Sequence, residues 1–364
     1  MTAPKGPRDL NRRAKHMVDL ATGSAKEPAV PSKNLAAARV ASAGSHTLRH
    51  YILFLKSIYT GTIHLISKAF ESNIFGAAWR FHKLADESIV AVVIGHLKVA
   101  RTMNRPGTLA LTKRYPNLVR AYLNSNYLAK SFSRKTRREI LKFHYEYMME
   151  YVVESFFEQI VESSCILWSK IINDNRYAIS LSFNSKSYRE GDLSLIFSKN
   201  NISLYEISFT VVPGTLIGCA ADRVLLVGRV QGEKDQIEEI RSATRACGDI
   251  APPHLLMVAA QSIAGTLVIG AIGGVSKEQQ LSASNDVFVF DYDAFWKTFI
   301  VKKETAGIYE ILVPFLEKPL EQISLYHRRR ARRKRQYKKQ IGASVAAAFA
   351  ETFLKTQLPS SLCE

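Results

Sequence analysis

Residues 250–276, IAPPHLLMVAAQSIAGTLVIGAIGGVS, contain no Lys, Arg, Asp or Glu. The stretch is long enough to span a bilayer, but it opens on two prolines, holds Gln261 and breaks at Gly265-Thr266. We interpret it as a buried helix over residues 254–264 followed by a buried strand over residues 267–273, because a strand covered on both faces is apolar throughout. A membrane span is the alternative interpretation.

The segments on either side of this stretch have two different periodicities. Residues 48–165 have a helical pattern, and the longest helix is expected over residues 133–172. From residue 177 onward, RYAISLSFNS, DLSLIFS, LYEISFTVV and RVLLVGRVQ are short β-branched or alternating runs, typical of an antiparallel meander. A helical stretch, EKDQIEEIRSATRA, precedes the apolar one, and DVFVFDY and IYEILVP follow it as further strands.

This order predicts an α+β fold, with an N-terminal all-helical region followed by a mixed, mostly antiparallel sheet with helices. We expect a basic, disordered arm over residues 1–45 and a helical region over residues 46–175. An α+β domain over residues 176–322 and a basic, then amphipathic C-terminal helix over residues 323–364 complete the chain.

The 364-residue chain has the composition of a globular protein, with 47% hydrophobic and 23% charged residues. Its net charge of +18 is concentrated: residues 1–60 hold ten Lys or Arg and three Asp or Glu, and nine of the twelve residues 328–339 are basic. The four cysteines are widely spaced, which indicates neither a disulfide framework nor a zinc site. The N-terminus lacks the apolar stretch of a secretory signal, so we expect a cytoplasmic protein.

Several short motifs occur in one order along the chain: SYREGDLSL (187–195), GRVQG (228–232), CGDIAPPHLL (247–256), DYDAFW (291–296) and HRRRARRKRQY (327–337). Together with the upstream pair His144-Tyr145, this order resembles the VirK/YbjX family of bacterial proteins, a domain of unknown function, over about residues 79–341. The resemblance implies a cytoplasmic protein associated with virulence and with properties of the cell envelope, and with that association we expect a peripheral location at the inner membrane. It implies no agreed reaction.

The order of a strand (224–230), a helix (253–264) and a strand (267–273) is similar to the core of GCN5-like acyltransferases. Those proteins hold the pyrophosphate of coenzyme A at a glycine-bearing loop that opens a helix. The resemblance implies an acyltransferase that uses coenzyme A or acyl-coenzyme A; a non-catalytic binding module is the alternative. The residues expected to bind the cofactor are Arg229, Gln231, Gly232, Arg245 and Gly248. Ile250 and the additional helix over residues 233–246 depart from that pattern.

Two segments contain candidate catalytic residues. In Arg189-Glu190-Gly191-Asp192, Glu190 is a candidate general base and Arg189 a candidate anion clamp. The alternative for this segment is a hairpin turn in which Gly191 supplies a positive φ. His144 is a further catalytic candidate with Tyr145 as its partner, against the alternative of a core histidine. For Asp291-Tyr292-Asp293 we expect no metal site, because the residues that follow look like core.

The basic run predicts an anion-binding surface, for which the candidates are Arg328, Arg329, Arg332, Arg333 and Arg335. We expect an anionic membrane surface or an anionic ligand as its partner; nucleic acid is less favoured because no groove-reading motif is present. An apolar stripe at i, i+4 follows the run and predicts a helix over about residues 325–355; its members are Tyr337, Ile341, Val345, Phe349 and Phe353. Internal pairing with an acidic ridge is a third alternative, and that ridge consists of Glu146, Glu150, Glu154, Glu158 and Glu162.

Overall fold

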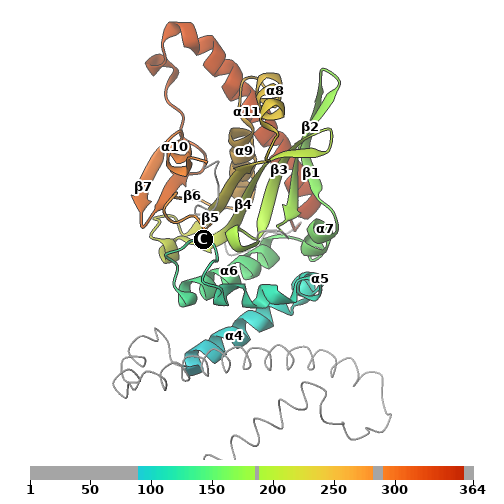
Figure 1. The fold of residues 1–364 in the computed structure, drawn as a ribbon, viewed down its shortest axis with the longest axis vertical. Coiled ribbons are helices and arrows are strands. Elements are labelled where there is room, and N and C mark those ends of the chain that lie inside the picture. The colour runs from blue at the N-terminus through green and yellow to red at the C-terminus, as the bar shows by residue number, and fades with distance from the viewer. Residues whose placement is uncertain (1–88, 185–187, 282–289, 356–364) are drawn as a thin grey trace, which may run out of the picture. The chain divides into compact units, whose positions relative to one another are not determined.

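The computed structural model describes residues 89–184, 188–281 and 290–355 (Figure 1). The chain divides into two units, residues 1–100 and 101–364. The described residues of the first unit all belong to helix α4 (Ile89–Met103), which runs on into the second. The expected arm over residues 1–45 and any helix before residue 89 lie outside the described residues.

Within residues 89–162, the described part of the chain before the sheet, the regular elements are all helices. After α4 they are α5 (Pro106–Arg114), the 3₁₀ helix η1 (Pro116–Leu123), α6 (Arg134–Tyr151) and α7 (Phe156–Glu162). Pro106 and Pro116 lie at the first positions of α5 and η1, where a missing N–H costs nothing.

A single helix over residues 133–172 is a wrong prediction. Helix α6 begins after Ser133, whose hydroxyl accepts the N–H of Thr136, and it ends at Tyr151. Val152 is extended and forms a β-bridge with Leu354, a contact between segments far apart in the sequence. Residues 165–172 form a strand instead. The glutamates at every fourth residue continue through this break, so their spacing alone does not reveal it.

The sheet contains eight strands in the order β1-β2-β3-β4-β5-β6-β8-β7. Their bounds are β1 (Cys165–Ile172), β2 (Asn175–Phe183), β3 (Leu193–Lys199), β4 (Ile202–Pro213), β5 (Arg223–Gly232), β6 (Ala271–Val275), β7 (Val301–Thr305) and β8 (Ile308–Leu312). Neighbouring strands are antiparallel except β5 and β6, which are parallel. The expected α+β class with a mostly antiparallel sheet is therefore confirmed.

Two segments differ from the expected strands. The strand expected over residues 267–273 begins later, as β6, because residues 267 and 269 still donate their N–H groups to carbonyls at the end of the preceding helix. The strand expected over residues 286–292 lies largely outside the described residues, and helix α10 (Tyr292–Trp296) begins at its end.

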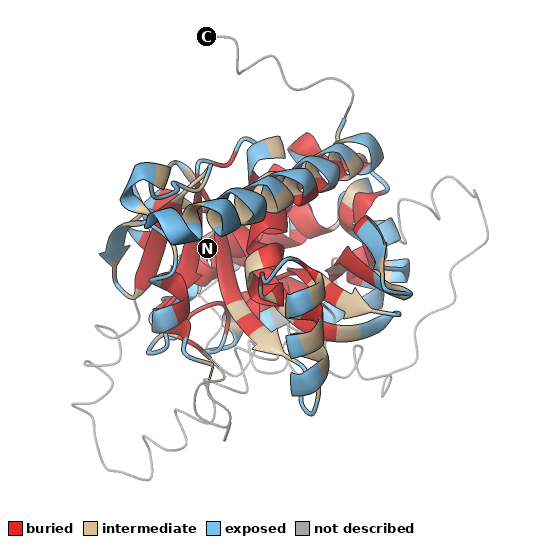
Figure 2. Ribbon diagram, turned by 90° about the horizontal axis from the view of Figure 1, so that it is seen from above, coloured by how far each residue is buried: buried red, intermediate tan, exposed pale blue. Residues whose placement is uncertain are grey.

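The parallel strands β5 and β6 are joined through α8 (Ile237–Ala246) and α9 (Pro252–Thr266). Helix α9, which confirms the predicted buried helix, packs across β3, β4 and β5. Helix α11 (Leu325–Phe353) packs on α9 and β1, and Figure 2 shows buried residues beneath it and exposed residues along it. Its stripe of Ile341, Val345, Phe349 and Phe353 is buried, which confirms the amphipathic helix.

Short 3₁₀ helices connect the larger elements: η2 (Tyr188–Glu190), η3 (Gly214–Ile217) and η4 (Leu320–Gln322). Among the helices that the structure describes, none combines the length and the apolar character needed to cross a bilayer.

Candidate functional site

The segment Arg189-Glu190-Gly191-Asp192 connects β2 to β3 and lies directly against β4 and β5. A Cβ atom on Gly191 would lie 2.4 Å from the backbone nitrogen of Phe209. A Cβ atom on Gly228 of β5 would lie 2.2 Å from the carbonyl oxygen of Glu190. Two glycines therefore allow the connection to pack on the sheet backbone, and Gly191 adopts a φ of +150°.

Asp192 anchors this connection from inside the protein. Its side chain is completely buried and accepts hydrogen bonds from three hydroxyl groups. The donors are Tyr127 Oη at 2.8 Å, Tyr145 Oη at 2.9 Å and Thr210 Oγ1 at 2.7 Å. A buried carboxylate is costly unless it is paired in this way, so the three donors stabilise the charged form and fix the position of the connection.

Burial, and then the Asp192 carboxylate, raise the pKa of Tyr127 and Tyr145 well above the ordinary value. Both phenols therefore remain protonated donors. Tyr145 was predicted as a partner of His144, but its hydroxyl is directed to Asp192.

His144 is also completely buried, on α6, where its Nδ1 accepts the N–H of Val211 at 3.1 Å. Burial lowers its pKa, so the ring is neutral near pH 7 and Nε2 carries the proton. The pair His144-Tyr145 thus lies in the interior, and a catalytic role for it stays a prediction.

Glu190 and Arg229 form the charged part of the site, in which Glu190 is buried and Arg229 is partly exposed. The Glu190 side chain is 8% exposed, and its Oε2 lies 3.6 Å from Nε of Arg229, which is 21% exposed. Arg229 also donates from Nε to Oε1 of Gln231 at 2.9 Å. The structure therefore places the predicted base, Glu190, beside two of the predicted cofactor residues.

The parallel strands separate next to this ion pair. Their last paired residues are Val227 and Gly274, and β5 continues beyond that point to Gly232. The hydroxyl of Tyr292, from α10, accepts the N–H of Val230 and donates to its carbonyl, both at 3.2 Å. The side chain of Tyr292 thus takes up hydrogen-bonding groups that a neighbouring strand would use in a continuous sheet.

Gln280 lies between Tyr292 and Glu190 and contacts both side chains. Its Nε2 donates to the hydroxyl of Tyr292 at 2.8 Å and lies 3.5 Å from Oε1 of Glu190. Burial raises the pKa of Tyr292 to about 12, which keeps its hydroxyl protonated. The arrangement offers a carboxylate, a guanidinium and a strand edge within one cluster.

Sequence reasoning missed four residues of this cluster and its anchor: Tyr127, Asp192, Gln280 and Tyr292. Asp192 lies in a short polar segment between two apolar strands, which is a usable signal for a buried carboxylate. Tyr127, Gln280 and Tyr292 have no such signal, because only the folding of separate segments brings them together.

Of the other predicted cofactor residues, Arg245 lies in the last turn of α8 and Gly248 lies just beyond the end of that helix. That helix has ten residues and is about 15 Å long at its rise per residue. Gly248 has a φ of +71°, and its Cβ position would face the ring of Tyr337 at 3.7 Å. The prolines at the start of α9 have no N–H, which removes two donors that a helix N-terminus would offer to a phosphate.

The two aspartates of the DYD segment are engaged by backbone groups. Asp291 Oδ1 accepts the N–H of Ala294 at 3.0 Å and caps α10, and Asp293 Oδ1 accepts the N–H of Lys277 at 3.1 Å. Within the described ranges, no group of His, Cys, Asp and Glu side chains could hold a metal ion.

The predicted anion-binding arginines have two kinds of environment. Arg328 donates from Nε to the carbonyl of Ile323 at 2.9 Å, and Arg335 pairs with Glu317 at 2.9 Å. Three others are exposed on α11: Arg329, Arg332 and Arg333. Arg189 is exposed on the β2–β3 connection, and its carbonyl accepts the N–H of Leu128 at 2.6 Å.

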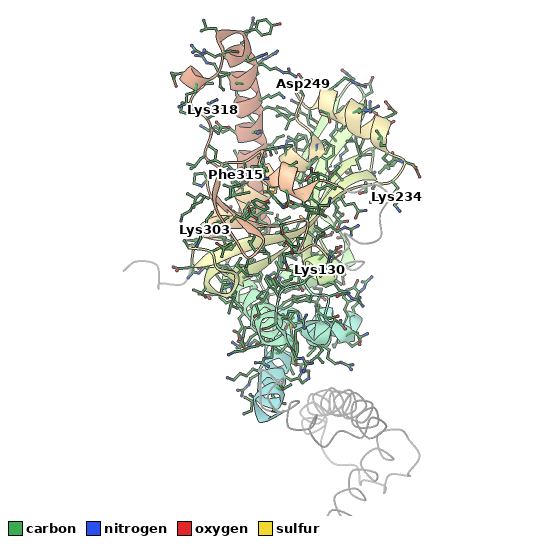
Figure 3. The ribbon with its side chains drawn as sticks, turned by 60° about the vertical axis from the view of Figure 1, so that its left-hand side comes forward. Lys130, Lys234, Asp249, Lys303, Phe315 and Lys318 are labelled. Atoms are coloured by element: carbon green, nitrogen blue, oxygen red, sulfur yellow. The ribbon has the colours of Figure 1, made fainter. Side chains whose placement is uncertain are left out.

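The acidic ridge and the basic run form separate ion pairs. Arg330 on α11 pairs at 3.0 Å with Asp249, which lies in the α8–α9 connection and is labelled in Figure 3. Glu146 of the ridge pairs with Lys142 on its own helix at 2.6 Å. Among the described residues no ion pair joins the two sets, and the internal pairing stays a prediction.

Comparison with known proteins places these features in a family. A family model described as "Protein of unknown function (DUF535)" matches residues 92–347. The chain is 28% identical over 239 residues to the uncharacterized protein YbjX of Escherichia coli (strain K12), covering 63% of this chain and 71% of that protein. No solved structure matches the chain. The matched residues include the complete sheet, the Glu190–Arg229 cluster and the basic part of α11, and the chain belongs to the DUF535 family, to which the VirK/YbjX resemblance refers.

Proposed function

We propose that the protein is an acyltransferase of the GCN5-like type, which binds an acyl thioester where β5 and β6 separate. The observation that carries the proposal is the edge of β5 at Val230, whose N–H and C=O groups are taken by the hydroxyl of Tyr292 rather than by a strand. In open sheets, ligands bind at the carboxyl ends of parallel strands, and this edge lies at the carboxyl end of β5.

The thioester arm of coenzyme A carries amide groups. An amide donates one hydrogen bond and accepts one, which matches the N–H and C=O of Val230. The arm would therefore replace the hydroxyl of Tyr292 along the strand edge. Arg229, next to this edge, supplies a positive charge for an anionic part of the ligand.

Glu190 is the proposed general base. Its carboxylate lies beside the strand edge and is oriented by Arg229 and Gln280. An acceptor amine or hydroxyl would give its proton to Glu190 and attack the thioester carbonyl, and the carbon–sulfur bond would break. The proton then passes from Glu190 to the thiolate that leaves.

Two features depart from the GCN5-like pattern and restrict which part of the ligand we expect the protein to bind. Helix α8 is inserted after β5, and Pro252 and Pro253 reduce the N–H donors at the start of α9. The pyrophosphate would therefore gain little from α9, and we expect binding to depend mainly on the acyl-pantetheine part. The VirK/YbjX resemblance favours a component of the cell envelope as the acceptor, at the inner face of the inner membrane.

The experiment is a thermal-shift titration of the purified chain with coenzyme A, acetyl-coenzyme A and a long-chain acyl-coenzyme A. We expect stabilisation of the wild type and of Glu190→Gln. Tyr292→Phe leaves the groups of Val230 without their hydroxyl partner and should bind the thioester more tightly. With an acceptor present, Glu190→Gln should release free thiol about 10²–10⁴-fold more slowly. Absence of any stabilisation in the wild type and in both variants would overturn the proposal.

A further inference from the structure

The first turn of α11 exposes two large side chains with apolar surface. Leu325 is 78% exposed and Tyr326 is 90% exposed, and they are the first two residues of the helix. Most of the other large apolar side chains on α11 are buried against the rest of the protein, so these two form a separate apolar tip.

Exposed arginines follow the tip within two turns. They are Arg329, Arg330, Arg332 and Arg333, and we call them the arginine collar. Arg330 also pairs with Asp249 at 3.0 Å. Residues four positions apart on a helix share a face, so Arg329 lies about one turn after Leu325 on the same face, and Arg330 about one turn after Tyr326. The first turn of α11 contains no acidic residue, and the first acidic residue of the whole helix is Glu351.

The tip is held rigidly away from the sheet. The C-terminal half of α11 is fixed by its buried stripe, while Arg328 and Arg335 bind the segment that leads into the helix. Figure 1 shows the first turns of α11 projecting beyond the end of the sheet. A projecting, preorganised helix end loses little conformational entropy when it binds a partner.

We infer that the tip and the arginine collar dock the protein on an anionic lipid surface. Leucine and tyrosine side chains enter the boundary between headgroups and acyl chains, to a depth of about 5–10 Å. One helical turn is about 5.4 Å, so the collar lies one to two turns behind the tip, at the level of the lipid phosphates. Arginine binds phosphate in a bidentate manner, and its long side chain adapts to this depth.

The apolar tip decides between a lipid surface and other polyanions. Nucleic acid would attract the collar by charge, but it offers no apolar layer for Leu325 and Tyr326. An acidic protein would need a matching hydrophobic groove at the end of one helix. A bilayer supplies an apolar layer for the tip and a phosphate layer for the collar, in the order in which the helix presents them. This inference does not depend on the proposed acyltransferase activity.

The experiment measures sedimentation of the full chain with vesicles of phosphatidylcholine alone and of phosphatidylcholine mixed with phosphatidylglycerol. One variant removes the tip (Leu325→Ser, Tyr326→Ser), and a second neutralises the collar (each arginine→Gln). Matched controls alter exposed residues elsewhere. Ile171→Ser with Ile202→Ser removes side chains that are 72% and 60% exposed, and Lys113, Arg114, Arg134 and Lys135, each →Gln, remove four exposed charges. Circular dichroism establishes that each variant is folded.

We expect the wild type and both controls to bind the anionic vesicles. The collar variant should bind at least roughly tenfold more weakly, because it loses four positive charges that attract an anionic leaflet. The tip variant should lose a similar factor but retain its affinity for duplex DNA. Equal binding by the wild type and the tip variant would overturn the inference, because charge alone would then account for the binding. Tighter retention on DNA than on anionic vesicles would overturn it in favour of nucleic acid.

Discussion

The hydrogen bond between Tyr145 and the buried Asp192 predicts a measurable coupling energy. Tyr145→Phe removes one of the three hydroxyl donors to this carboxylate, at a donor–acceptor distance of 2.9 Å. A hydrogen bond to a charged group contributes about 1.5–3 kcal/mol, so the variant should lose that much free energy of unfolding. In a chain that carries Asp192→Asn, the same bond joins two neutral groups and contributes about 0.5–1.5 kcal/mol. The difference, a coupling of roughly 1–1.5 kcal/mol, is the quantity to measure.

Urea unfolding followed by far-ultraviolet circular dichroism gives the free energies for the four chains of this cycle. Tyr147→Phe is the matched control, because the hydroxyl of Tyr147 donates to the carbonyl of Leu267 and not to Asp192. Tyr147→Phe should lower the free energy of unfolding by the same amount in the chain with Asp192 and in the chain with Asp192→Asn. If Tyr145→Phe also costs the same in both, Asp192 is not a charged acceptor for this phenol, and the account of how the β2–β3 connection is anchored fails.

Two further predictions concern packing and pH. Gly228→Ala should destabilise the fold by about 1–3 kcal/mol and displace Glu190, since the new Cβ would lie 2.2 Å from the carbonyl oxygen of Glu190. Gly265→Ala is the contrasting substitution: its Cβ would have nothing within 4 Å, and it should stabilise α9 by about 0.5–1 kcal/mol. Urea unfolding of both variants checks this, and equal effects would contradict it. Burial, and then Lys338 and Lys334, lower the pKa of His254 to about 4, so its neutral form contributes stability above pH 6.5 that is lost as the pH falls towards 4. The loss in the free energy of unfolding is up to about 3 kcal/mol, and His254→Gln should flatten the dependence of this free energy on pH. Identical slopes against pH for the wild type and the variant would refute the prediction.

The sequence was sufficient to predict an element where the local pattern of apolar residues agrees with the burial found in the structure. The uncharged apolar stretch of α9 and the apolar stripe of α11, which repeats at helical spacing, both form buried helical surfaces as predicted. The break after Tyr151 could not be found in this way, because Val152 leaves the helix to pair with Leu354. Distant contacts of this kind override local preference and leave no trace in the spacing of nearby residues.

The candidate site shows the same limit. Glu190 and Arg229 were each singled out from short motifs, but their proximity depends on the glycine at position 228 and on the pairing of β4 with β5. Tyr292 was considered only as the residue between two aspartates. Its role follows from the separation of β5 and β6, which no single segment encodes. Sequence reasoning thus finds residues with suitable chemistry, while sheet register decides which of them meet.

The basic half of α11 is costly for the isolated fold. Like charges four residues apart on a helix destabilise it by a few tenths of a kcal/mol per pair, and Asp249 and Glu317 offset only part of this repulsion. Burial, with the neighbouring charges of Lys334 and Arg335, lowers the pKa of Lys338, whereas Glu317 raises it. The segment stays helical because the buried stripe in the other half of α11 supplies the stability. A local cost maintained by stability from elsewhere is expected where a surface serves a partner. An anionic surface would relieve the repulsion, and it would do so at the helix end that exposes Leu325 and Tyr326.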